Sequence, residues 1–505
     1  MTDLDELMTL TERPVRTLSQ IAGEDGVPSG EVEVSGISDD SRSIRPGDAF
    51  LCLPRAGERA QTFVEQAAEA GASAIISVGH TYDVALPHLV LDDMEVVGRL
   101  LRRWFGTEKS EVRLIGITGT DGKTSVAWML RDALSRLHGQ AWSIGTLGWM
   151  RGPEDVVDLG NTTPSLLTMH RLLAVATEAG MPALVCEVSS HGIAQQRIAG
   201  LRMDAAIWTN LGHDHLQDHG GFAAYADIKT GFVRDVAEQG GIVICNADAD
   251  EANARAPETA LRFGHGLYRQ ELSLAWEQEL PGMVRFRSAL SENEEVLVED
   301  IPLGDFHAEN LACVALVLLS LFRVPLEKIP ALLNGISAPP GRMQPLGIGR
   351  QQIFIDYAHT PEALERCLAT ARTITRRRLM LVFGCGGERD REKRPEMGGI
   401  AVRLADVVWV TSDNPRSEVP EVIASEIVQG MPQPYPADVH LQLDRRQAIA
   451  DAVAEIESGD VLVIAGKGHE TYMEVEGRRL PWSDIEVAAE ALRDRDHLKS
   501  FKACA

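Results

Sequence analysis

The residues that most restrict the fold of this chain are the ten at positions 115–124, which read IGITGTDGKT. An apolar, strand-like run, VRLIGI, leads into them, and a helix-like run, TSVAWMLRDALSRL, follows. A strand, a glycine loop ending in Gly-Lys-Thr and a helix, in this order, are typical of a phosphate site, because the free N–H groups of the helix suit phosphate oxygens. The standard pattern has a glycine where this chain has Ile117, so we interpret the loop as a variant; a glycine-rich turn with a solvated lysine is the alternative.

The chain as a whole divides into three regions, since 505 residues are too many for one ordinary core. Residues 1–108 contain the strand-like runs AFLCLP, ASAIISV and PHLVL and read as a small α/β unit. Residues 109–338 and 339–505 alternate apolar runs with helical patterns, which predicts parallel sheets. We interpret APPGRMQP, at 338–345, as a hinge. Because ligands bind at the carboxyl ends of parallel strands, we expect a cleft between the two larger regions.

Charge and cysteine usage narrow the class of protein. A net charge of −25 without a basic run argues against nucleic acid or an anionic membrane as partner. The seven cysteines are scattered and form no Cys-x-x-Cys pair, as expected in a reducing compartment. The start of the chain is acidic, and no apolar run approaches the length of a membrane span. We therefore expect a soluble cytoplasmic protein.

A cluster of histidines follows the apolar run DAAIWTNL. The sequence GHDHLQDHG, at 212–220, brings together His213, His215, Asp218 and His219, and this density indicates metal. The metallo-β-lactamase pattern His-x-His-x-Asp-His is a rival, but this chain has one residue too many before the Asp-His pair. A polar loop of hydrogen-bonded histidines is the other alternative.

Taken together, these motifs resemble those of the Mur ligases, the ATP-dependent amide-forming enzymes of peptidoglycan precursor synthesis. The resemblance covers nearly the whole chain and is strongest to the branch that adds the third amino acid of the peptide. The strings that carry it, in the order of the family, are GITGTDGKT, GNTTPS, CEVSSHGIAQQR, NLGHDHLQDHG, PPGRMQ, DYAHTPEAL, GCGGERDREKRPEMG, SDNPRSE and GKGHETY.

The resemblance implies a three-domain α/β architecture. Residues 1–108 would form a small uridine-binding domain, residues 109–338 a P-loop-type ATPase domain with a parallel sheet, and residues 339–505 a Rossmann-like domain that binds the amino acid. It also implies the reaction. ATP converts the D-glutamate carboxylate of UDP-N-acetylmuramoyl-L-alanyl-D-glutamate into an acyl phosphate, which an amine then attacks. Such chemistry needs Mg²⁺ and positive groups around the transferring phosphoryl group; members of the family are often monomers.

The resemblance assigns roles residue by residue. The expected catalytic residues are Lys123, Glu187, His215 and Lys229. The expected metal ligands are Thr124, Glu187, His215 and Lys229 as a carbamate, since a bare ammonium would be repelled by Mg²⁺. The expected ATP contacts are Gly119, Thr120, Asp121, Gly122, Lys123, Thr124, Ser125, Asn310, Arg342, Asp356 and His359.

For the uridine-sugar peptide, the matching positions are Ser41, Arg42, Asn161, Thr162, Thr163, Ser189, Gln195 and Arg197. Three places depart from the family. The loop RAGERAQTF, at 55–63, lacks the Asp-Gly-His or Asp-Gly-Arg of relatives, which leaves the uridine contacts of that loop open. His307 stands where asparagine is common, and Ser125 follows Lys-Thr where a second threonine is usual.

The string SDNPRSE bears on which amino acid is added. Relatives that add meso-diaminopimelate carry Asp-Asn-Pro-Arg, here Asp413, Asn414, Pro415 and Arg416. A guanidinium gives a bidentate partner to the second carboxylate of meso-diaminopimelate, whereas it would repel the terminal ammonium of lysine. The other matching pocket positions are Arg389, Gly466 and Glu470, and Glu470 could take the distal ammonium.

Alternatives remain at this point. Within the fold they are a lysine-adding relative, another Mur ligase or a folylpolyglutamate synthetase, and DNPR and GKGHE argue against all three. A non-catalytic nucleotide-binding protein of the same fold belongs to a different class. The intact Lys123, Glu187, His215, Lys229 and Arg416 argue against it.

Overall fold

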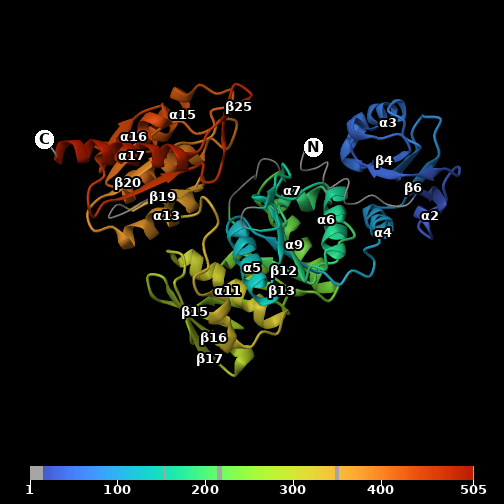
Figure 1. Ribbon diagram of the computed structural model, residues 1–505, viewed down its shortest axis with the longest axis horizontal. Coiled ribbons are helices and arrows are strands. Elements are labelled where there is room, and N and C mark those ends of the chain that lie inside the picture. The colour runs from blue at the N-terminus through green and yellow to red at the C-terminus, as the bar shows by residue number, and fades with distance from the viewer. Residues whose placement is uncertain (1–14, 153–154, 213–218, 347–351, 504–505) are drawn as a thin grey trace.

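The computed structural model describes residues 15–152, 155–212, 219–346 and 352–503. Figure 1 shows three lobes in chain order, with the N-terminal and C-terminal lobes on different sides of the central one. Within these ranges, no helix is both long and apolar enough to cross a lipid bilayer. The predicted three-unit α/β architecture is confirmed.

The N-terminal lobe is a small parallel sheet with helices packed on it. Its elements are β1 (Arg16–Thr17), α2 (Leu18–Ala22), β2 (Glu33–Val34), β3 (Gly36–Ser38), η1 (Ser41–Ser43), β4 (Asp48–Cys52), η2 (Pro54–Arg59), α3 (Ala60–Glu69), β5 (Ala74–Val78), β6 (His88–Leu91) and α4 (Met94–Phe105). Strands β3, β4, β5 and β6 pair in this order and are parallel, whereas β1 and β2 form a separate antiparallel pair. The predicted runs at β4, β5 and β6 are therefore strands. Asp93 caps α4 by accepting from the backbone N–H of Val96.

The central lobe contains one long mixed sheet. Its elements are β7 (Arg113–Thr118), α5 (Lys123–His138), β8 (Trp142–Gly145), β9 (Gly148–Met150), β10 (Val156–Val157), α6 (Leu166–Glu178), β11 (Ala183–Glu187), α7 (Ser190–Ala194), β12 (Ala205–Trp208), α9 (Phe222–Glu238), β13 (Ile242–Asn246), α10 (Asp250–Arg255), β14 (Leu261–His265), β15 (Leu274–Leu280), β16 (Met283–Ser288), η3 (Ala289–Ser291), β17 (Glu294–Glu299), α11 (Asp305–Ser320), η4 (Leu326–Lys328) and α12 (Ile329–Leu333).

The strand order in this lobe is β10-β9-β8-β11-β7-β12-β13-β14-β15-β16-β17. Pairing is parallel from β8 to β15 and antiparallel at both ends. Ile115 and Ile117 of β7 pack in the core that contains α5 and α11, and Leu114 packs on the opposite face with α6 and α9. This alternation is that of a strand buried on both faces, and it places β7 in the middle of the sheet.

The C-terminal lobe is a second, mostly parallel sheet covered by helices. Its elements are β18 (Gln344–Leu346), β19 (Gln352–Asp356), α13 (Pro361–Ile374), β20 (Leu379–Phe383), α14 (Lys393–Leu404), β21 (Val407–Val410), α15 (Pro420–Gln429), β22 (Asp438–Leu441), α16 (Arg445–Glu455), β23 (Val461–Ala465), β24 (Tyr472–Val475), β25 (Arg478–Pro481) and α17 (Asp484–Ala503). The order is β18-β19-β23-β20-β21-β22, and β18 alone is antiparallel in this sheet of the described chain.

The two joints between lobes differ in character. Leu166 and Leu167 of α6 belong to the same buried cluster as Leu101 of α4, so an apolar core crosses from the N-terminal to the central lobe. Gly98 lies so close to Gly200 that a Cβ on Gly98 would come within 2.4 Å of the Gly200 Cα. Between the central and C-terminal lobes, by contrast, a polar cavity opens.

Candidate active site

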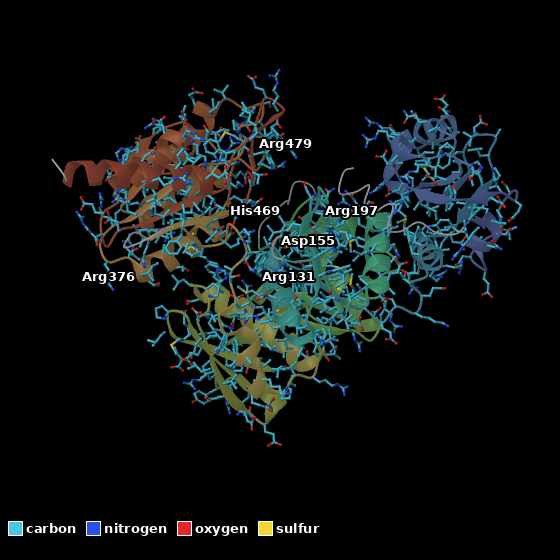
Figure 2. All side chains as sticks on the ribbon, viewed as in Figure 1. Arg131, Asp155, Arg197, Arg376, His469 and Arg479 are labelled. Carbon is cyan, nitrogen blue, oxygen red and sulfur yellow. The ribbon has the colours of Figure 1, made fainter. Side chains whose placement is uncertain are left out.

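A cavity of about 420 Å³ lies between the central and C-terminal lobes, where the sequence predicted a cleft. The carboxyl ends of β7 and β11 and the N-terminus of α5 form one side of it. Figure 2 shows Arg197 on the central lobe and His469 on the C-terminal lobe, where that lobe faces the central one. The predicted residues that line the cavity are Gly119, Thr120, Asp121, Gly122, Lys123, Thr124, Ser125, Asn161, Thr162, Thr163, Glu187, Ser189, Arg197, Lys229, Asn310, Arg342, Asp356 and His359.

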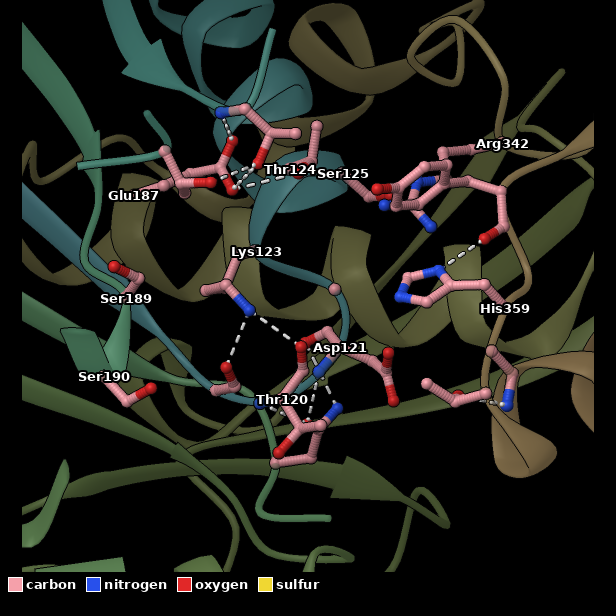
Figure 3. A pocket seen from close by; sticks show the side chains of 18 of the residues that line it. Thr120, Asp121, Lys123, Thr124, Ser125, Glu187, Ser189, Ser190, Arg342 and His359 are labelled. Carbon is pink, nitrogen blue, oxygen red and sulfur yellow. Dashed lines mark hydrogen bonds between the residues drawn. The ribbon is translucent and has the colours of Figure 1, made fainter. Parts of the chain in front are cut away.

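The glycine loop joins β7 to α5. Helix α5 begins after Gly122 without a side-chain cap, so its first N–H groups are available to an anion. The side chain of Asn210 accepts hydrogen bonds from the backbone N–H groups of Thr120 and Asp121, at 3.0 and 2.8 Å, and so holds the loop in shape. Lys123 Nζ donates to the carbonyl oxygens of Gly119 and Thr120, at 2.8 and 2.7 Å (Figure 3).

Two glycines explain why this loop departs from the standard pattern. Gly116 lies inside β7, where a Cβ would come within 2.7 Å of the ring of Phe232 on α9. Its role is therefore to let a helix pack on the strand. Gly119 has φ 147°, and a Cβ there would overlap the hydroxyl of Thr209. The first glycine that the loop itself requires is thus Gly119.

A buried carboxylate faces the start of α5. Glu187, at the end of β11, accepts from the hydroxyl of Thr124 at 2.9 Å and from the backbone N–H of Thr146 at 2.9 Å (Figure 3). Burial raises the pKa of Glu187, and the charge of Lys123 and these hydrogen bonds oppose that rise. A carboxylate and a hydroxyl beside a phosphate loop are the oxygen ligands that suit Mg²⁺. The donor set therefore fits a magnesium ion shared with phosphate.

The remaining predicted metal ligands are His215 and Lys229, and the structure describes only the second of them. His215 lies outside the described residues. Lys229, on α9, is 1% exposed and donates to the carbonyl of Gly119 at 2.9 Å, with its ammonium 4.8 Å from the ring centre of Tyr225. Among the described residues, no group of three or more His, Cys, Asp or Glu side chains is close enough to hold a metal ion. Lys229 and Glu187 nevertheless line one cavity.

The C-terminal lobe contributes the opposite wall. The guanidinium of Arg342 lies 4.5 Å from the ring centre of Tyr357. Asp356, at the end of β19, accepts from the backbone N–H groups of Met343 and Ala358, and burial raises its pKa although Arg342 opposes this. The ring of His359 lies at the cavity edge with Nδ1 2.8 Å from the carbonyl of Tyr357 (Figure 3).

On α11, Asn310 reaches the glycine loop, since a Cβ on Gly122 would lie 3.0 Å from its side-chain oxygen. His307, at a position where the resemblance leads one to expect asparagine, is fully buried, and burial lowers its pKa to about 3. Neither of its ring nitrogens has a hydrogen-bond partner among the described residues. It does not line the cavity, unlike Asn310.

A hydroxyl-rich wall continues from Glu187 toward the N-terminal lobe. Thr163 donates to the carbonyl of Glu187 at 2.9 Å and accepts from the backbone N–H of Ser189 at 3.0 Å. Arg197 donates to the carbonyl of Thr163 at 2.6 Å and to the side chain of Gln195 at 2.7 Å. Gln195 itself does not line the cavity; it orients Arg197. Burial lowers the pKa of Arg197, and the nearby charge of Arg55 acts in the same direction.

A second cavity lies between the N-terminal lobe and the start of α6. It is lined by Ser41, Arg42 and Asn161, and also by Arg55 and Arg59 of the divergent loop. Ser41 and Arg42 are thus brought to one cavity, whose wall at Asn161 is shared with the first. The loop at 55–63 therefore lies beside the predicted uridine contacts.

The predicted amino-acid pocket lies at the carboxyl ends of β21 and β23. Arg416 has φ 54°, and its Nε lies 3.1 Å from a carboxylate oxygen of Glu474. Asn414 donates to Glu470 at 2.8 Å, and Lys467 donates to the same oxygen at 2.8 Å. Pro415 lies between Asn414 and Arg416, and the remaining predicted residues placed nearby are Arg389, Asp413 and Gly466. None of these residues lines the cavity between the central and C-terminal lobes.

A buried ion pair contacts the backbone of the two loops that form this pocket. Arg445 and Asp484 are both fully buried and lie 2.6 Å apart. Arg445 also donates to the carbonyl of Ser412, two residues after β21, and to the carbonyl of Ala465, the last residue of β23. The pair therefore fixes the spacing of the DNPR and GKGHE loops.

Sequence reasoning missed several residues that the structure places here. Asn210 lies in a motif two residues after β12, and Lys467 lies in a motif three positions before Glu470. Those positions could have singled them out. Thr146 and Tyr225 carry no local signal, because each reaches the site only through the fold.

The chain is similar to known proteins over almost its whole length. Residues 117–318 match the Mur ligase middle domain, and residues 341–468 match the Mur ligase, glutamate ligase domain. A UDP-N-acetylmuramoyl-L-alanyl-D-glutamate–2,6-diaminopimelate ligase from Ectopseudomonas mendocina (strain ymp) is 38% identical over 481 residues, which cover 93% of this chain and 96% of that protein. A solved structure of a ligase with the same name has a TM-score of 0.68 and 30% identity, covering 96% of this chain and 100% of that one.

A more distant structure shares the fold alone. It is the MurF ligase from Thermotoga maritima in complex with ADP, with a TM-score of 0.62 and 18% identity. The similarity covers 92% of this chain and 98% of that one.

Proposed function

The chain belongs to the Mur ligase family, and we propose that it adds meso-2,6-diaminopimelate to the D-glutamate of UDP-N-acetylmuramoyl-L-alanyl-D-glutamate in peptidoglycan precursor synthesis. It is an ATP-dependent, amide-forming ligase. One observation carries the proposal: a single cavity holds the glycine loop, the Glu187–Thr124 pair and the wall of Arg197. The γ-phosphate of ATP and an acceptor carboxylate would meet in that space.

The reaction proceeds in two steps. An oxygen of the D-glutamate carboxylate attacks the γ-phosphorus of ATP, and ADP leaves with the electrons of the broken P–O bond. The amine of meso-diaminopimelate then attacks the acyl carbon, loses a proton, and expels inorganic phosphate as the amide forms. A carboxylate by itself would have to expel oxide, so activation by ATP is required.

The residues of this chain do little covalent chemistry in this scheme. The N–H groups at the start of α5 bind phosphate oxygens. Lys123 gives up its hydrogen bonds to the carbonyls of Gly119 and Thr120 and binds the β- and γ-phosphates instead. Thr124 and Glu187, together with His215 and a carbamylated Lys229, would hold Mg²⁺. When bound, the ion would neutralise the charge that develops on the transferring phosphoryl group.

The other predicted residues orient the substrates. Arg197, held by Gln195 and Thr163, binds an anionic group of the muramoyl peptide close to Glu187. Arg342, Asp356 and His359 bring the C-terminal lobe onto ATP from the opposite wall of the cavity. Closing the lobes excludes water from the acyl phosphate, which would otherwise hydrolyse.

Each lobe takes one substrate in this proposal. Residues 1–108 hold the uridine end, residues 109–338 hold ATP, and residues 339–505 hold the amino acid. We also propose that the enzyme works as a monomer in the cytoplasm.

Phosphate release from ATP, measured with UDP-N-acetylmuramoyl-L-alanyl-D-glutamate and one of three additions, tests this function. The additions are meso-diaminopimelate, L-lysine and no amine. Release that requires meso-diaminopimelate is the expected result. Release that occurs with L-lysine but not with meso-diaminopimelate would support a ligase and contradict the amino-acid assignment. If neither amine gives phosphate release, the proposed function is contradicted.

A further inference from the structure

Two basic residues at the amino-acid pocket are already paired with carboxylates of the protein. Arg416 Nε lies 3.1 Å from Glu474, and Lys467 Nζ lies 2.8 Å from Glu470. The side chain of Lys467 is fully buried, and that of Glu470 is 16% exposed. These are partly desolvated ion pairs, so each charge depends strongly on its partner.

The side chain of Asn414 joins the two pairs. Its oxygen accepts from Lys467 Nζ at 2.9 Å and from the backbone N–H of Glu474 at 2.8 Å. Its nitrogen donates to Glu470 at 2.8 Å. Lys467 therefore fixes both the carboxylate of Glu470 and the orientation of the Asn414 amide.

The six charged side chains described at the pocket, three of each sign, carry no net charge together. Two cations face two carboxylates in direct contact, and Arg389 and Asp413 add one charge of each sign nearby. A ligand that brings a net charge would upset this balance, whereas a ligand that brings one charge of each sign would not.

We propose that Lys467 is a specificity-determining residue, whose charge neutralises Glu470 and thereby restricts the pocket to amino acids with a zwitterionic distal end. The inference rests on the proposed function. A distal head with both an ammonium and a carboxylate can pair with members of both ion pairs without leaving a charge uncompensated. The lone terminal ammonium of lysine would have to displace Lys467 from Glu470 and would leave one buried cation without a partner.

Removing the charge of Lys467 should reverse this preference. In Lys467→Gln, Glu470 would be a largely buried carboxylate without its cation, and a lone ammonium is the group that supplies one. We expect the ratio of kcat/KM for L-lysine to that for meso-diaminopimelate to rise by at least about tenfold. The KM for ATP should stay unchanged, because Lys467 does not line the cavity that holds the predicted ATP contacts.

Two further variants separate charge from structure. Lys467→Arg keeps the cation and should keep the preference of the wild type. Arg479→Gln removes an exposed cation of β25, labelled in Figure 2, and it should leave the ratio unchanged. The guanidinium of Arg479 lies 4.4 Å from the ring centre of Tyr472. Adding Glu470→Gln to Lys467→Gln should abolish the gain for lysine, since no carboxylate then remains to accept the ammonium.

Ligand-induced thermal stabilisation gives a readout that does not depend on turnover. L-lysine should raise the Tm of Lys467→Gln more than that of the wild type, and meso-diaminopimelate should raise it less. An unchanged ratio and unchanged shifts in Lys467→Gln, or an equal change in Lys467→Arg, would overturn the inference.

The activity of the wild type then shows which of the two proposals has failed. If the wild type uses meso-diaminopimelate, only the specificity role of Lys467 has failed; if it uses neither amine, the proposed function has failed. Should Lys467→Gln not fold, as shown by loss of the ATP-induced shift, Lys467→Met replaces it with the same expected outcomes.

Discussion

The glycine loop and the amino-acid pocket both lie at the carboxyl ends of parallel strands, yet they treat their cations differently. In the loop, Lys123 donates to the neutral carbonyls of Gly119 and Thr120. In the pocket, Arg416 and Lys467 lie against carboxylates, at 3.1 and 2.8 Å. The two sites therefore differ in the groups that contact their cations directly, which are carbonyls in the loop and carboxylates in the pocket.

This difference indicates which ligand suits each site. A lysine held by carbonyls at an uncapped helix N-terminus leaves its positive charge for a polyanion such as ATP. A pocket whose cations already have carboxylates favours a ligand with both charges. We expect substitutions in the loop to affect phosphoryl transfer, and substitutions in the pocket to affect amine binding.

The largest effect should come from Lys123→Ala. Without this cation the β- and γ-phosphates lose a positive partner in the transition state, so turnover should fall by at least about a thousandfold. Phosphate release measures the loss, and circular dichroism checks the fold. Lys328→Ala, at an exposed lysine of η4, is the matched control. Wild-type rates in Lys123→Ala would remove the loop from the mechanism.

Lys229→Ala tests whether the cavity needs the anionic carbamate that we propose forms on this lysine. We expect it to be nearly inactive and partly rescued by short carboxylic acids such as acetate, which supply the missing carboxylate group. The measurement is the phosphate release rate against acetate concentration, with chloride as the salt control. Full activity without acetate would show that no carbamate is required.

Arg416→Gln should act on amine binding alone. Loss of this guanidinium leaves Glu474 without its cation and removes the partner of the distal carboxylate, so the KM for meso-diaminopimelate should rise by about 100-fold. The KM for ATP should not change. Arg478→Gln, at an exposed arginine of β25, is the control. A matching rise in the KM for ATP would mean that the two sites are not independent in the way proposed.

The smallest expected effect is on stability, and it concerns His170, which lies outside both sites. Burial lowers the pKa of His170 to about 4, and its Nε2 lies 3.0 Å from the carbonyl of Ala199. Because the unfolded state binds a proton near pH 6.5 and the folded state does not, stability is complete above that pH and falls as the pH drops toward 4. The loss should be about 2 kcal/mol at pH 5.

His170→Gln should therefore show a smaller decrease in Tm between pH 7.5 and pH 5 than the wild type. The loop and pocket would not be involved, so ligand-induced stabilisation by ATP at pH 7.5 should be unaffected. Equal decreases in the two proteins would contradict the assignment.

Much of the fold could be predicted because its strands are buried on both faces. Uninterrupted apolar runs such as those of β7 and β23 identify central strands by themselves. The antiparallel strands β15 to β17 were not predicted. They alternate apolar and polar residues, as in Val284 and Arg285, and so contain no uninterrupted apolar run of the kind that identified the other strands.

Only those site residues that belong to short sequence motifs could be predicted. The motif around Glu187 indicated a metal ligand, but not that Thr146 would hold its carboxylate. Likewise, the motif indicated that Glu470 could take the distal ammonium, but not that Lys467 would pair with it. Which charges are already compensated depends on contacts across the fold, and a spacing pattern does not contain that information.

Activation of the carboxylate by ATP is tested most directly by following its oxygen. UDP-N-acetylmuramoyl-L-alanyl-D-glutamate would carry oxygen-18 in the side-chain carboxylate of D-glutamate, and the released phosphate would be analysed by mass spectrometry in the presence of meso-diaminopimelate. If an acyl phosphate forms, each phosphate released contains one labelled oxygen and the amide product retains the other. Unlabelled phosphate would show that ATP is hydrolysed by water, and that the loop and the carboxylate do not meet as proposed.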